Sequence, residues 1–579
     1  MKTKKKSASR AERPSAKRVS PAGFGFAGLP AWVAVCAAAA IALWAYTPAL
    51  NGVFVFDDQY LPFFSPHYAE QNLIEAIRGV RPLLMFSFWI NNRMAGVEPF
   101  QYHLWNLAFH LLNSLLVFLI ARRIFELAAH AAPGRDWAAA AAAAIFLLHP
   151  VQTEAVSYVA SRSENLSALF FLAAFAVFLC RRGTAVDWKT VAAITMLYAA
   201  AVSTKEHTIT LAGLLLLTDY YWNPGFTTAG IRRNWRLYAP LAAAAVVLAF
   251  AALRLVRGAT SAGFGLKDLP WNHYLYTQFK ALWVYFRLFL FPTGQNIDHA
   301  YPVSRSLLEP AVLLGAAGLA ALMVAAWRWR KRFPVISFSF FGALLIFSPT
   351  SSILPIMDAL VERRLYLPMS LLVLIPADLL VRWRVRAALR VAVVLIVVVV
   401  LAVLCHQRNR VWASDVALWE DAVAKAPHNS RAHFQLAVAY YQQQRCAEAI
   451  PHFEAAERLG TKDDTLYIDW ALAADCLDQP ELAINLLKKA AGIRRRALTF
   501  TQMALVHGKR KQYAEAMAAL DEAERINPRE DTIYFYRGNV LVALGKPEEA
   551  AIQYRRALEL NRDNEAARRA LARLEALKR

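Results

Sequence analysis

The sequence changes character near residue 406, and this change limits what the chain can fold into. Before it, long apolar runs recur every few dozen residues, and after it a polar helical repeat continues to the C-terminus. The composition is 57% hydrophobic and only 19% charged, which fits a membrane protein better than a soluble one. At 579 residues the chain is too long for one compact domain. We therefore expect an all-α, polytopic membrane protein with a soluble domain attached.

The first 28 residues form a basic tail, which contributes to the net charge of +22. Such a tail can attract nucleic acid or an anionic membrane surface, and the apolar run at 29–50 that follows favours the membrane over nucleic acid. A cleaved signal peptide is the alternative, but the run is long for one and lacks a clear small-residue cleavage site. We interpret it as a retained signal anchor behind a cytoplasmic N-terminus.

Eleven apolar stretches within 29–406 are candidates to cross a bilayer, for which a helix needs roughly 20 residues. They lie near 29–50, 102–121, 137–151, 164–180, 188–203, 206–222, 237–255, 311–327, 335–355, 365–381 and 388–405. A twelfth stretch, 275–292, is interrupted by Lys280 and Arg287.

Basic residues set the orientation, because Lys and Arg are enriched in cytoplasmic loops. Five basic loops fall on the cytoplasmic side only if 275–292 does not cross, so we expect that segment to be interfacial or re-entrant on the outer side. Eleven crossings place the C-terminal domain outside. The Ala- and Arg-rich composition is typical of a bacterium, so we expect the bacterial inner membrane, with the C-terminal domain in the periplasm.

The C-terminal domain is built from a repeat. Small residues recur at Ala449, Ala483, Ala516 and Ala550, with steps of 34, 33 and 34 residues, and a second Ala series follows seven residues later. This period matches the tetratricopeptide (TPR) pattern of stacked helix pairs. It predicts four repeats over 430–564, a linker and half repeat over 407–429, and a capping helix over 565–579. The groove of such an α-solenoid suits a protein or peptide partner, and a spacer or dimerisation arm is the alternative.

Two of the five cysteines lie in the repeats. Cys446 opens the second helix of the first repeat, and Cys476 lies near the end of the first helix of the second repeat. These helices are adjacent and antiparallel, so we hypothesise a disulfide between them, which an oxidising periplasm would permit. No CxxC pair is present, so no metal site is indicated.

Charged residues collect in the loops predicted to be external. The first external loop, 51–100, carries the pair Asp57-Asp58, and later loops carry Glu154, Lys205-Glu206 and Glu362-Arg363-Arg364. Surface ion pairs at helix ends explain any one of these loops, but the set on one side favours a polar active-site cavity. A carboxylate there can take a proton from a hydroxyl, and Arg and Lys can neutralise a phosphate leaving group. Apolar walls can hold a lipid tail, so the chemistry is that of sugar transfer from a polyprenyl phosphate.

The order of these motifs resembles one known family over nearly the whole chain. The motifs are Phe54–Asp58, Tyr102–Asn106 with His110, His149–Val156, Arg162–Glu164, Lys205-Glu206 and Glu362–Pro368, followed by the repeats. Together they resemble the transmembrane-and-TPR-containing protein O-mannosyltransferases, which are GT-C class membrane glycosyltransferases. The resemblance implies an extracytoplasmic active site, a lipid-phosphate sugar donor, transfer to protein Ser/Thr hydroxyls, and no divalent metal or other cofactor.

The resemblance also assigns roles to residues. It implies that Asp57 or Asp58 is the general base, and a neighbouring family with Asp-Glu at this place leaves open which one. It implies donor-phosphate ligands and supporting residues; the ligands are Arg81, Arg162, Lys205, Arg363 and Arg364, and the supporting residues are His103, Glu154, Glu206, Glu362 and Tyr366. The acceptor protein is expected in the TPR groove. The alternatives are an oligosaccharyltransferase of the pilin-glycosylating type, a non-enzymatic TPR scaffold and a transporter.

Overall fold

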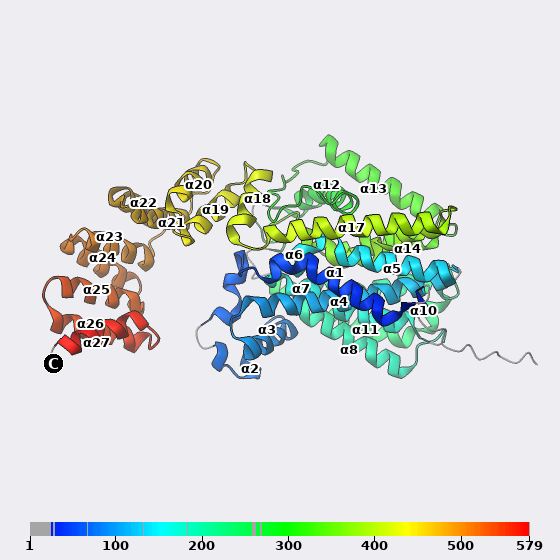
Figure 1. The fold of residues 1–579 in the computed structure, drawn as a ribbon, viewed down its shortest axis with the longest axis horizontal. Coiled ribbons are helices and arrows are strands. Elements are labelled where there is room, and N and C mark those ends of the chain that lie inside the picture. Colours follow the sequence, from blue (N-terminus) through cyan, green and yellow to red (C-terminus); the bar gives the residue numbers. More distant parts are fainter. Residues whose placement is uncertain are drawn as a thin grey trace, which may run out of the picture.

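The computed structural model describes residues 25–26, 29–65, 68–130, 132–181, 183–256, 262–266 and 269–577. Most of the basic tail therefore lies outside the described residues. The described part is helical apart from two-residue strands β1 (Gly25–Phe26) and β2 (Leu29–Pro30), which pair in antiparallel fashion. Figure 1 shows a bundle of long helices, with a separate arm of short helix pairs at one end. This confirms the predicted fold class.

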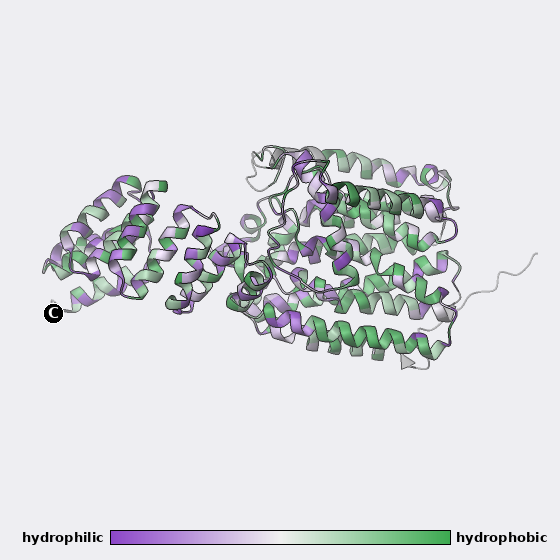
Figure 2. Cartoon of the chain, turned by 90° about the horizontal axis from the view of Figure 1, so that it is seen from above, coloured by the Kyte–Doolittle hydropathy of each residue, from purple (hydrophilic) through white to green (hydrophobic). Residues whose placement is uncertain are grey.

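The bundle contains the apolar part of the chain, and Figure 2 shows apolar residues along most of its long helices. Its helices are α1 (Ala31–Leu50), α2 (Leu73–Ala76), α3 (Pro82–Ala95), α4 (Pro99–Leu127), α5 (Ala132–Leu148), α6 (Thr153–Val156), α7 (Arg162–Leu179), α8 (Trp188–Thr204), α9 (Leu211–Trp222), α10 (Ala229–Arg233), α11 (Trp235–Val256), α12 (Trp271–Leu290), α13 (Pro310–Arg328), α14 (Pro334–Phe347), α15 (Tyr366–Leu372), α16 (Leu374–Arg382) and α17 (Ala387–Val411).

Six described helical segments are long and apolar enough to cross a membrane, and a seventh follows if a pair bent by 50° counts as one span. The segments are Trp32–Leu50, Pro99–Leu127, Val159–Leu179, Pro310–Arg328, Glu362–Arg382 and Ala387–Val411, and the bent pair is Gly134–Leu148 with Pro150–Val156. The other four predicted spans correspond to α8, α9, α11 and α14. Two are shorter than expected, since α9 begins only at Leu211 and α14 ends at Phe347. The eleven crossings stay a prediction.

Helix α12 lies across the ends of the long helices. Near its start, the Tyr274 hydroxyl donates to the carbonyl of Thr350, 2.5 Å away. Near its end, the carbonyl of Phe289 lies 3.1 Å from His149 Nε2. His149 belongs to a segment predicted to be external, and Thr350, predicted within a span, follows the end of α14. Helix α12 is seen foreshortened beside α13 in Figure 1. A helix held at both ends by one side of the bundle has the position expected of the predicted interfacial segment.

The arm consists of successive antiparallel helix pairs. Its helices are α18 (Asp415–Lys425), α19 (Ser430–Gln442), α20 (Cys446–Arg458), α21 (Asp464–Cys476), α22 (Pro480–Ile493), α23 (Ala497–Lys509), α24 (Tyr513–Ile526), α25 (Asp531–Ala543), α26 (Pro547–Leu560) and α27 (Glu565–Leu577). Ala449, Ala483, Ala516 and Ala550 are fully buried, because a small residue lets neighbouring helices approach closely. The turn inside each pair contains a residue of positive φ, at Gln444, Asp478, Lys511 and Gly545.

The predicted disulfide is present. Cys446 and Cys476 are bonded, with their Cα atoms 6.3 Å apart, and they join α20 to α21. The bond therefore ties the first helix pair of the arm to the second. Cys36, Cys180 and Cys405 are free.

The boundary between bundle and arm differs from the prediction. We expected a linker from residue 407, but α17 continues to Val411 and α18 begins at Asp415. Trp412 and Trp419 are buried in one apolar cluster with Val55 and Tyr158, which lie in two loops of the bundle. Two tryptophans bury a large apolar area, so the first helix of the arm is packed onto the bundle rather than tethered to it.

Candidate functional site

The loop that follows α1 presents Asp57 on a strained turn. Phe56 has φ of +50°, a conformation that residues other than glycine rarely adopt. Its backbone N–H donates to Asp415 Oδ1 of α18 at 2.9 Å, and its ring packs against Tyr158 and Trp419. The turn is therefore held from the bundle and from the arm, and a short 3-10 helix, Phe56–Tyr60, follows it.

The two aspartates of this turn differ in environment. Asp58 is fully buried, and its carboxylate accepts from the backbone N–H of Ala160 at 2.6 Å and of Val55 at 3.2 Å. Burial raises the pKa of Asp58 to about 8, although these N–H groups favour the ionised form. Asp57 is exposed, and its backbone N–H lies 3.2 Å from the Tyr158 hydroxyl oxygen, which accepts it. Asp58 is therefore a fixed part of the loop, while the Asp57 carboxylate is open to an incoming group.

Three cations and three carboxylates from distant parts of the chain meet in ion pairs; we call Arg81, Glu154, Glu164, Lys205, Glu206 and Arg363 the polar cluster. Arg81 binds Glu206 with two hydrogen bonds of 2.9 and 2.8 Å. Lys205 Nζ lies 2.5 Å from Glu164 Oε1. Arg363 donates to Glu154 through Nη1 at 2.5 Å and through its backbone N–H at 2.9 Å.

The ends of the helices position the polar cluster. Arg81 immediately precedes α3, Glu154 and Glu164 lie in the first turns of α6 and α7, and Lys205 immediately follows α8. Arg363 belongs to a 3-10 helix, Glu362–Leu365, before α15. Helix ends leave polar groups at the boundary of an apolar bundle, where charged side chains can reach water or headgroups.

The polar cluster is electrostatically continuous. The charges of Arg81 and Arg363 both act on Lys205, and burial is the main cause that lowers the pKa of Lys205. Tyr158 contacts Asp57 and also lies within the field of Arg363. The 3-10 helix that carries Asp57 packs on the segment Val159–Ser161, which contacts α6 and α7, the helices of Glu154 and Glu164. The Asp57 loop therefore adjoins the polar cluster, and the arm begins beside it.

Four residues assigned by the resemblance lie elsewhere. Arg162 is fully buried and donates to the side chains of Asn91 and Asn106 and to the carbonyl of Tyr102. Arg364 donates to Tyr274 and to the carbonyls of Asp358 and Ala359. Tyr366 bonds His110, Asn113 and Asn165 inside the bundle, and His103 is buried behind the Asp57 loop. These positions fit structural support rather than contact with a donor phosphate.

Glu362 is surrounded by residues to which the sequence assigned no role at the site. Its buried carboxylate accepts from the backbone N–H of Asn296 at 2.6 Å and from the side chain of Gln295 at 3.1 Å, and His299 Nε2 lies 2.9 Å away. The segment 295–299 has no periodic pattern. The adjacent acid and base, Asp298-His299, are the one feature of the sequence that could have indicated polar contacts in this segment.

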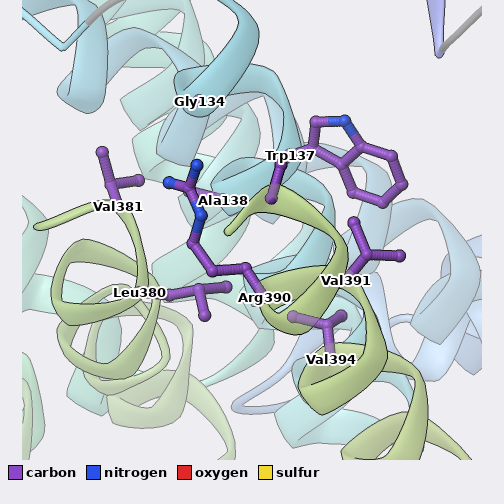
Figure 3. Close-up of a pocket in the computed structure, with 9 residues that line it drawn as sticks. Gly134, Trp137, Ala138, Leu380, Val381, Arg390, Val391 and Val394 are labelled. Carbon is purple, nitrogen blue, oxygen red and sulfur yellow. The ribbon is translucent and has the colours of Figure 1, made fainter. Parts of the chain in front are cut away.

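An apolar pocket lies away from the polar cluster. Figure 3 shows it between the start of α5, the end of α16 and the start of α17, with a volume of about 200 Å³ and one cation, Arg390. The polar cluster instead follows the end of α5, and the arm follows the end of α17, so the pocket lies toward the opposite end of the bundle. Among the described residues, no group of three or more His, Cys, Asp or Glu side chains is arranged to hold a metal ion.

The repeats are recognised by comparison with known proteins. Tetratricopeptide-repeat family profiles match residues 416–464 and 532–564. Among solved structures, the TPR protein YrrB is similar with a TM-score of 0.24 and 19% identity, over 27% of this chain and 80% of that one. TTC0263, a thermophilic TPR protein of Thermus thermophilus, is similar with a TM-score of 0.26 and 20% identity, over 31% of this chain and 95% of that one.

Similarity to curated proteins extends into the bundle. Mouse protein O-mannosyl-transferase TMTC3 is 24% identical over 84% of this chain and 58% of the relative, and Caenorhabditis elegans protein O-mannosyl-transferase F38B6.6 is 21% identical over 68% and 57%. Human TMTC3 is 30% identical over 152 residues, which are 26% of this chain and 16% of that protein. This chain thus spans little more than half the length of the first two relatives. Its curated homologues over most of its length are protein O-mannosyl-transferases.

Proposed function

We propose that this protein is a membrane glycosyltransferase of the GT-C class. It moves a sugar, mannose or another hexose, from a polyprenyl-phosphate donor to Ser/Thr hydroxyls of extracytoplasmic proteins. The observation that carries this proposal is the exposed Asp57 carboxylate on a loop that adjoins the helices of the polar cluster, at the end of the bundle that bears the repeats. The names of the curated relatives support the same activity.

Asp57 is the general base in this proposal. Its carboxylate takes the proton of the acceptor hydroxyl while the hydroxyl oxygen attacks the anomeric carbon of the sugar. The bond between that carbon and the phosphate oxygen breaks, and the phosphate leaves with the electron pair. Asp58 cannot serve equally well, because both its oxygens are occupied by backbone N–H groups inside the loop.

The cations of the polar cluster neutralise the leaving phosphate. Each retains donors beyond its carboxylate partner; Lys205 has three N–H groups and makes two hydrogen bonds, to Glu164 and Ser163. The carboxylates balance the cations before the donor binds, which reduces the cost of keeping three positive charges together. Charge-assisted bonds to phosphate belong to the same strong class as those to carboxylate, so the donors that the carboxylates leave free can bind the donor phosphate.

In this proposal the repeats bind the acceptor protein. The arm begins beside Asp57, and stacked helix pairs form a surface suited to a peptide. We place the protein in the bacterial inner membrane, with the N-terminus in the cytoplasm and the repeats in the periplasm. Transfer is proposed to need no divalent metal, and the sugar and the acceptor protein are left to experiment.

Intact masses of periplasmic proteins test the proposal. Strains would carry wild type, Asp57→Asn, or the control Glu98→Gln, which alters an exposed carboxylate of the same loop. We expect hexose-sized increments to persist in the control, whereas Asp57→Asn lowers transfer by about 10²- to 10⁴-fold, as for loss of a general base. Unchanged masses in Asp57→Asn would contradict the proposal and favour a scaffold. Larger, chelator-sensitive increments would indicate an oligosaccharyltransferase.

A further inference from the structure

Arg431, in the first helix of the first repeat, connects the arm to two external loops of the bundle. Its Nε lies 2.5 Å from Asp298 Oδ2, and its Nη2 lies 2.8 Å from Asp358 Oδ1. The Asp298 side chain is 8% exposed and that of Arg431 is 43% exposed, so this pair is partly sheltered from solvent, whereas Asp358, at 39%, is more open. One guanidinium therefore holds two loops that are distant in sequence.

The first loop is bonded to Glu362, the residue that precedes Arg363 of the polar cluster. The Asp298 backbone N–H donates to the Asn296 side chain at 3.2 Å, and the Asn296 N–H donates to Glu362 at 2.6 Å. Gln295 and His299 bind the same Glu362 carboxylate. Glu362 is the neighbour of Arg363 in one short 3-10 helix, so the bonds that fix Glu362 also fix the backbone from which the Arg363 side chain extends.

The second loop reaches the same 3-10 helix. The carbonyl of Asp358 accepts from Arg364 Nη2 at 2.7 Å, while the side chain of Asp358 binds Arg431. Arg363 therefore lies between two residues, Glu362 and Arg364, that are each connected to Arg431 through one loop.

Further bonds from the arm fix the first of these loops. Lys425 Nζ donates to the carbonyl of Gln295 at 2.7 Å, and Asn429 Nδ2 donates to the carbonyl of Asp298 at 3.3 Å. Asn296 Nδ2 donates back to the carbonyl of Ala422 at 3.3 Å. We call residues 295–299 the strap, because they are bonded to the arm on one side and to Glu362 on the other.

We infer that Arg431 is a positioning residue for sugar transfer: through the strap and Asp358 it fixes the 3-10 helix that carries Arg363. The inference rests on the proposed function, since Arg363 is placed there as a ligand of the donor phosphate. It adds a residue of the repeat domain to the machinery of the bundle. The first repeat then has a role in catalysis that is separate from binding the acceptor.

Hydrogen exchange of the full-length protein tests the mechanical connection without needing activity. We expect Arg431→Gln to accelerate exchange in residues 295–299 and 362–364 by about tenfold, because local opening then costs less. The control is Arg445→Gln, which removes an exposed ion pair to Glu448 in the same repeat. Unchanged exchange at 362–364 in Arg431→Gln would overturn the inference, whatever the activity.

Steady-state transfer tests the catalytic consequence, with undecaprenyl-phosphate mannose and a short Ser/Thr peptide as probes. Misplacing a phosphate ligand should lower kcat by about tenfold or more in Arg431→Gln. KM for the peptide should stay near the wild-type value, and Arg431→Lys should recover part of kcat. A change in peptide KM alone would overturn the inference, because Arg431 would then act in acceptor binding.

A second variant distinguishes a loss of positioning from misfolding of Arg431→Gln. Asp298→Asn removes the negative charge that pairs with Arg431, and its effect should not add to that of Arg431→Gln in the double variant. Additive losses would contradict a shared path. If the wild type transfers no sugar to the peptide, the proposed function fails with these probes, and the exchange rates alone decide whether Arg431 holds the 3-10 helix.

Discussion

The bundle and the arm bury polar side chains in different ways. Inside the bundle, Arg162, Glu154 and Glu362 are almost wholly buried and make hydrogen bonds to other buried groups. In the arm the buried positions are mostly alanine and aromatic residues, and pairs such as Arg445 with Glu448 are 39% and 52% exposed. A bundle in lipid has no water to satisfy its polar groups, so each buried charge needs a protein partner.

In the bundle, buried charged residues position the groups proposed to react. In the arm, buried apolar residues determine how the helices pack. Buried Glu154, Glu164 and Glu362 lie at the end of the bundle that bears Asp57, whereas Asp219 and Asp378 are buried at the other end, in pairs with Arg181 and Arg382. The arm repeats one apolar packing pattern, so its surface residues are free to vary with the partner. We expect substitutions at buried charges of the bundle to cost more than those at similar side chains of the arm.

The largest contrast should come from two buried arginines. Arg162→Ala leaves two asparagine side chains and a carbonyl without a donor, and we expect a loss of about 3–5 kcal/mol, as when a buried charged network is broken. Arg537→Ala in the arm should cost about 1 kcal/mol, because its partners Asp521 and Glu524 are 61% and 36% exposed and can be hydrated. Thermal unfolding in one detergent compares them, and equal losses would contradict the distinction.

Removing the disulfide should weaken the arm alone. The double variant Cys446→Ser, Cys476→Ser should lose about 2–4 kcal/mol, because the unfolded chain regains the freedom that the crosslink removes. Hydrogen exchange should show the loss in 446–493 and not in the bundle, with Cys36→Ser, a free cysteine of α1, as the control. An equal loss of protection in α4 or α7 would mean that arm and bundle unfold as one unit.

The raised pKa of Asp58 predicts a pH dependence of the bundle. The folded protein keeps the Asp58 proton up to about pH 8, whereas the unfolded chain releases it near 3.8, so this stabilisation is complete in acid and is lost as pH rises between these values. Asp58→Asn cannot ionise and cannot accept both N–H groups. It should be less stable than wild type by about 1–3 kcal/mol at pH 5, with a smaller difference at pH 8. If the difference in unfolding temperature between wild type and Asp58→Asn were the same at pH 5 and at pH 8, this explanation would be excluded.

The smallest effect should come from the exposed pair of the first repeat. Arg445→Gln removes the ion pair with Glu448, and we expect a change of less than about 0.5 kcal/mol, since solvent and side-chain entropy offset such pairs. Urea unfolding of the full chain measures it, with 1 M salt as a second condition. A loss above about 1 kcal/mol, abolished by salt, would show that surface charges stabilise the arm more than its packing pattern suggests.

Much of the fold could be predicted because it depends on patterns of residues that are close together in the sequence. The apolar runs predicted the long helices, and the Ala series predicted the helix pairs of the arm, since helix packing needs a small residue at a fixed interval. The positions of Cys446 and Cys476 were enough to predict their bond. The lengths of α9 and α14 and the extension of α17 to Val411 could not be predicted as well, because helix ends depend on the groups that cap and cover them.

The sequence by itself determined that this protein has an apolar helical bundle, a TPR arm, and carboxylates and cations at one set of loops. Only the tertiary structure decided which of these meet: Arg81 with Glu206, Arg363 with Glu154, and Arg431 with Asp298. It also decided that Asp57 is open and Asp58 enclosed. The physical reason is that residue spacing fixes a side chain's place along its own helix, whereas its partners depend on how helices far apart in the chain pack together.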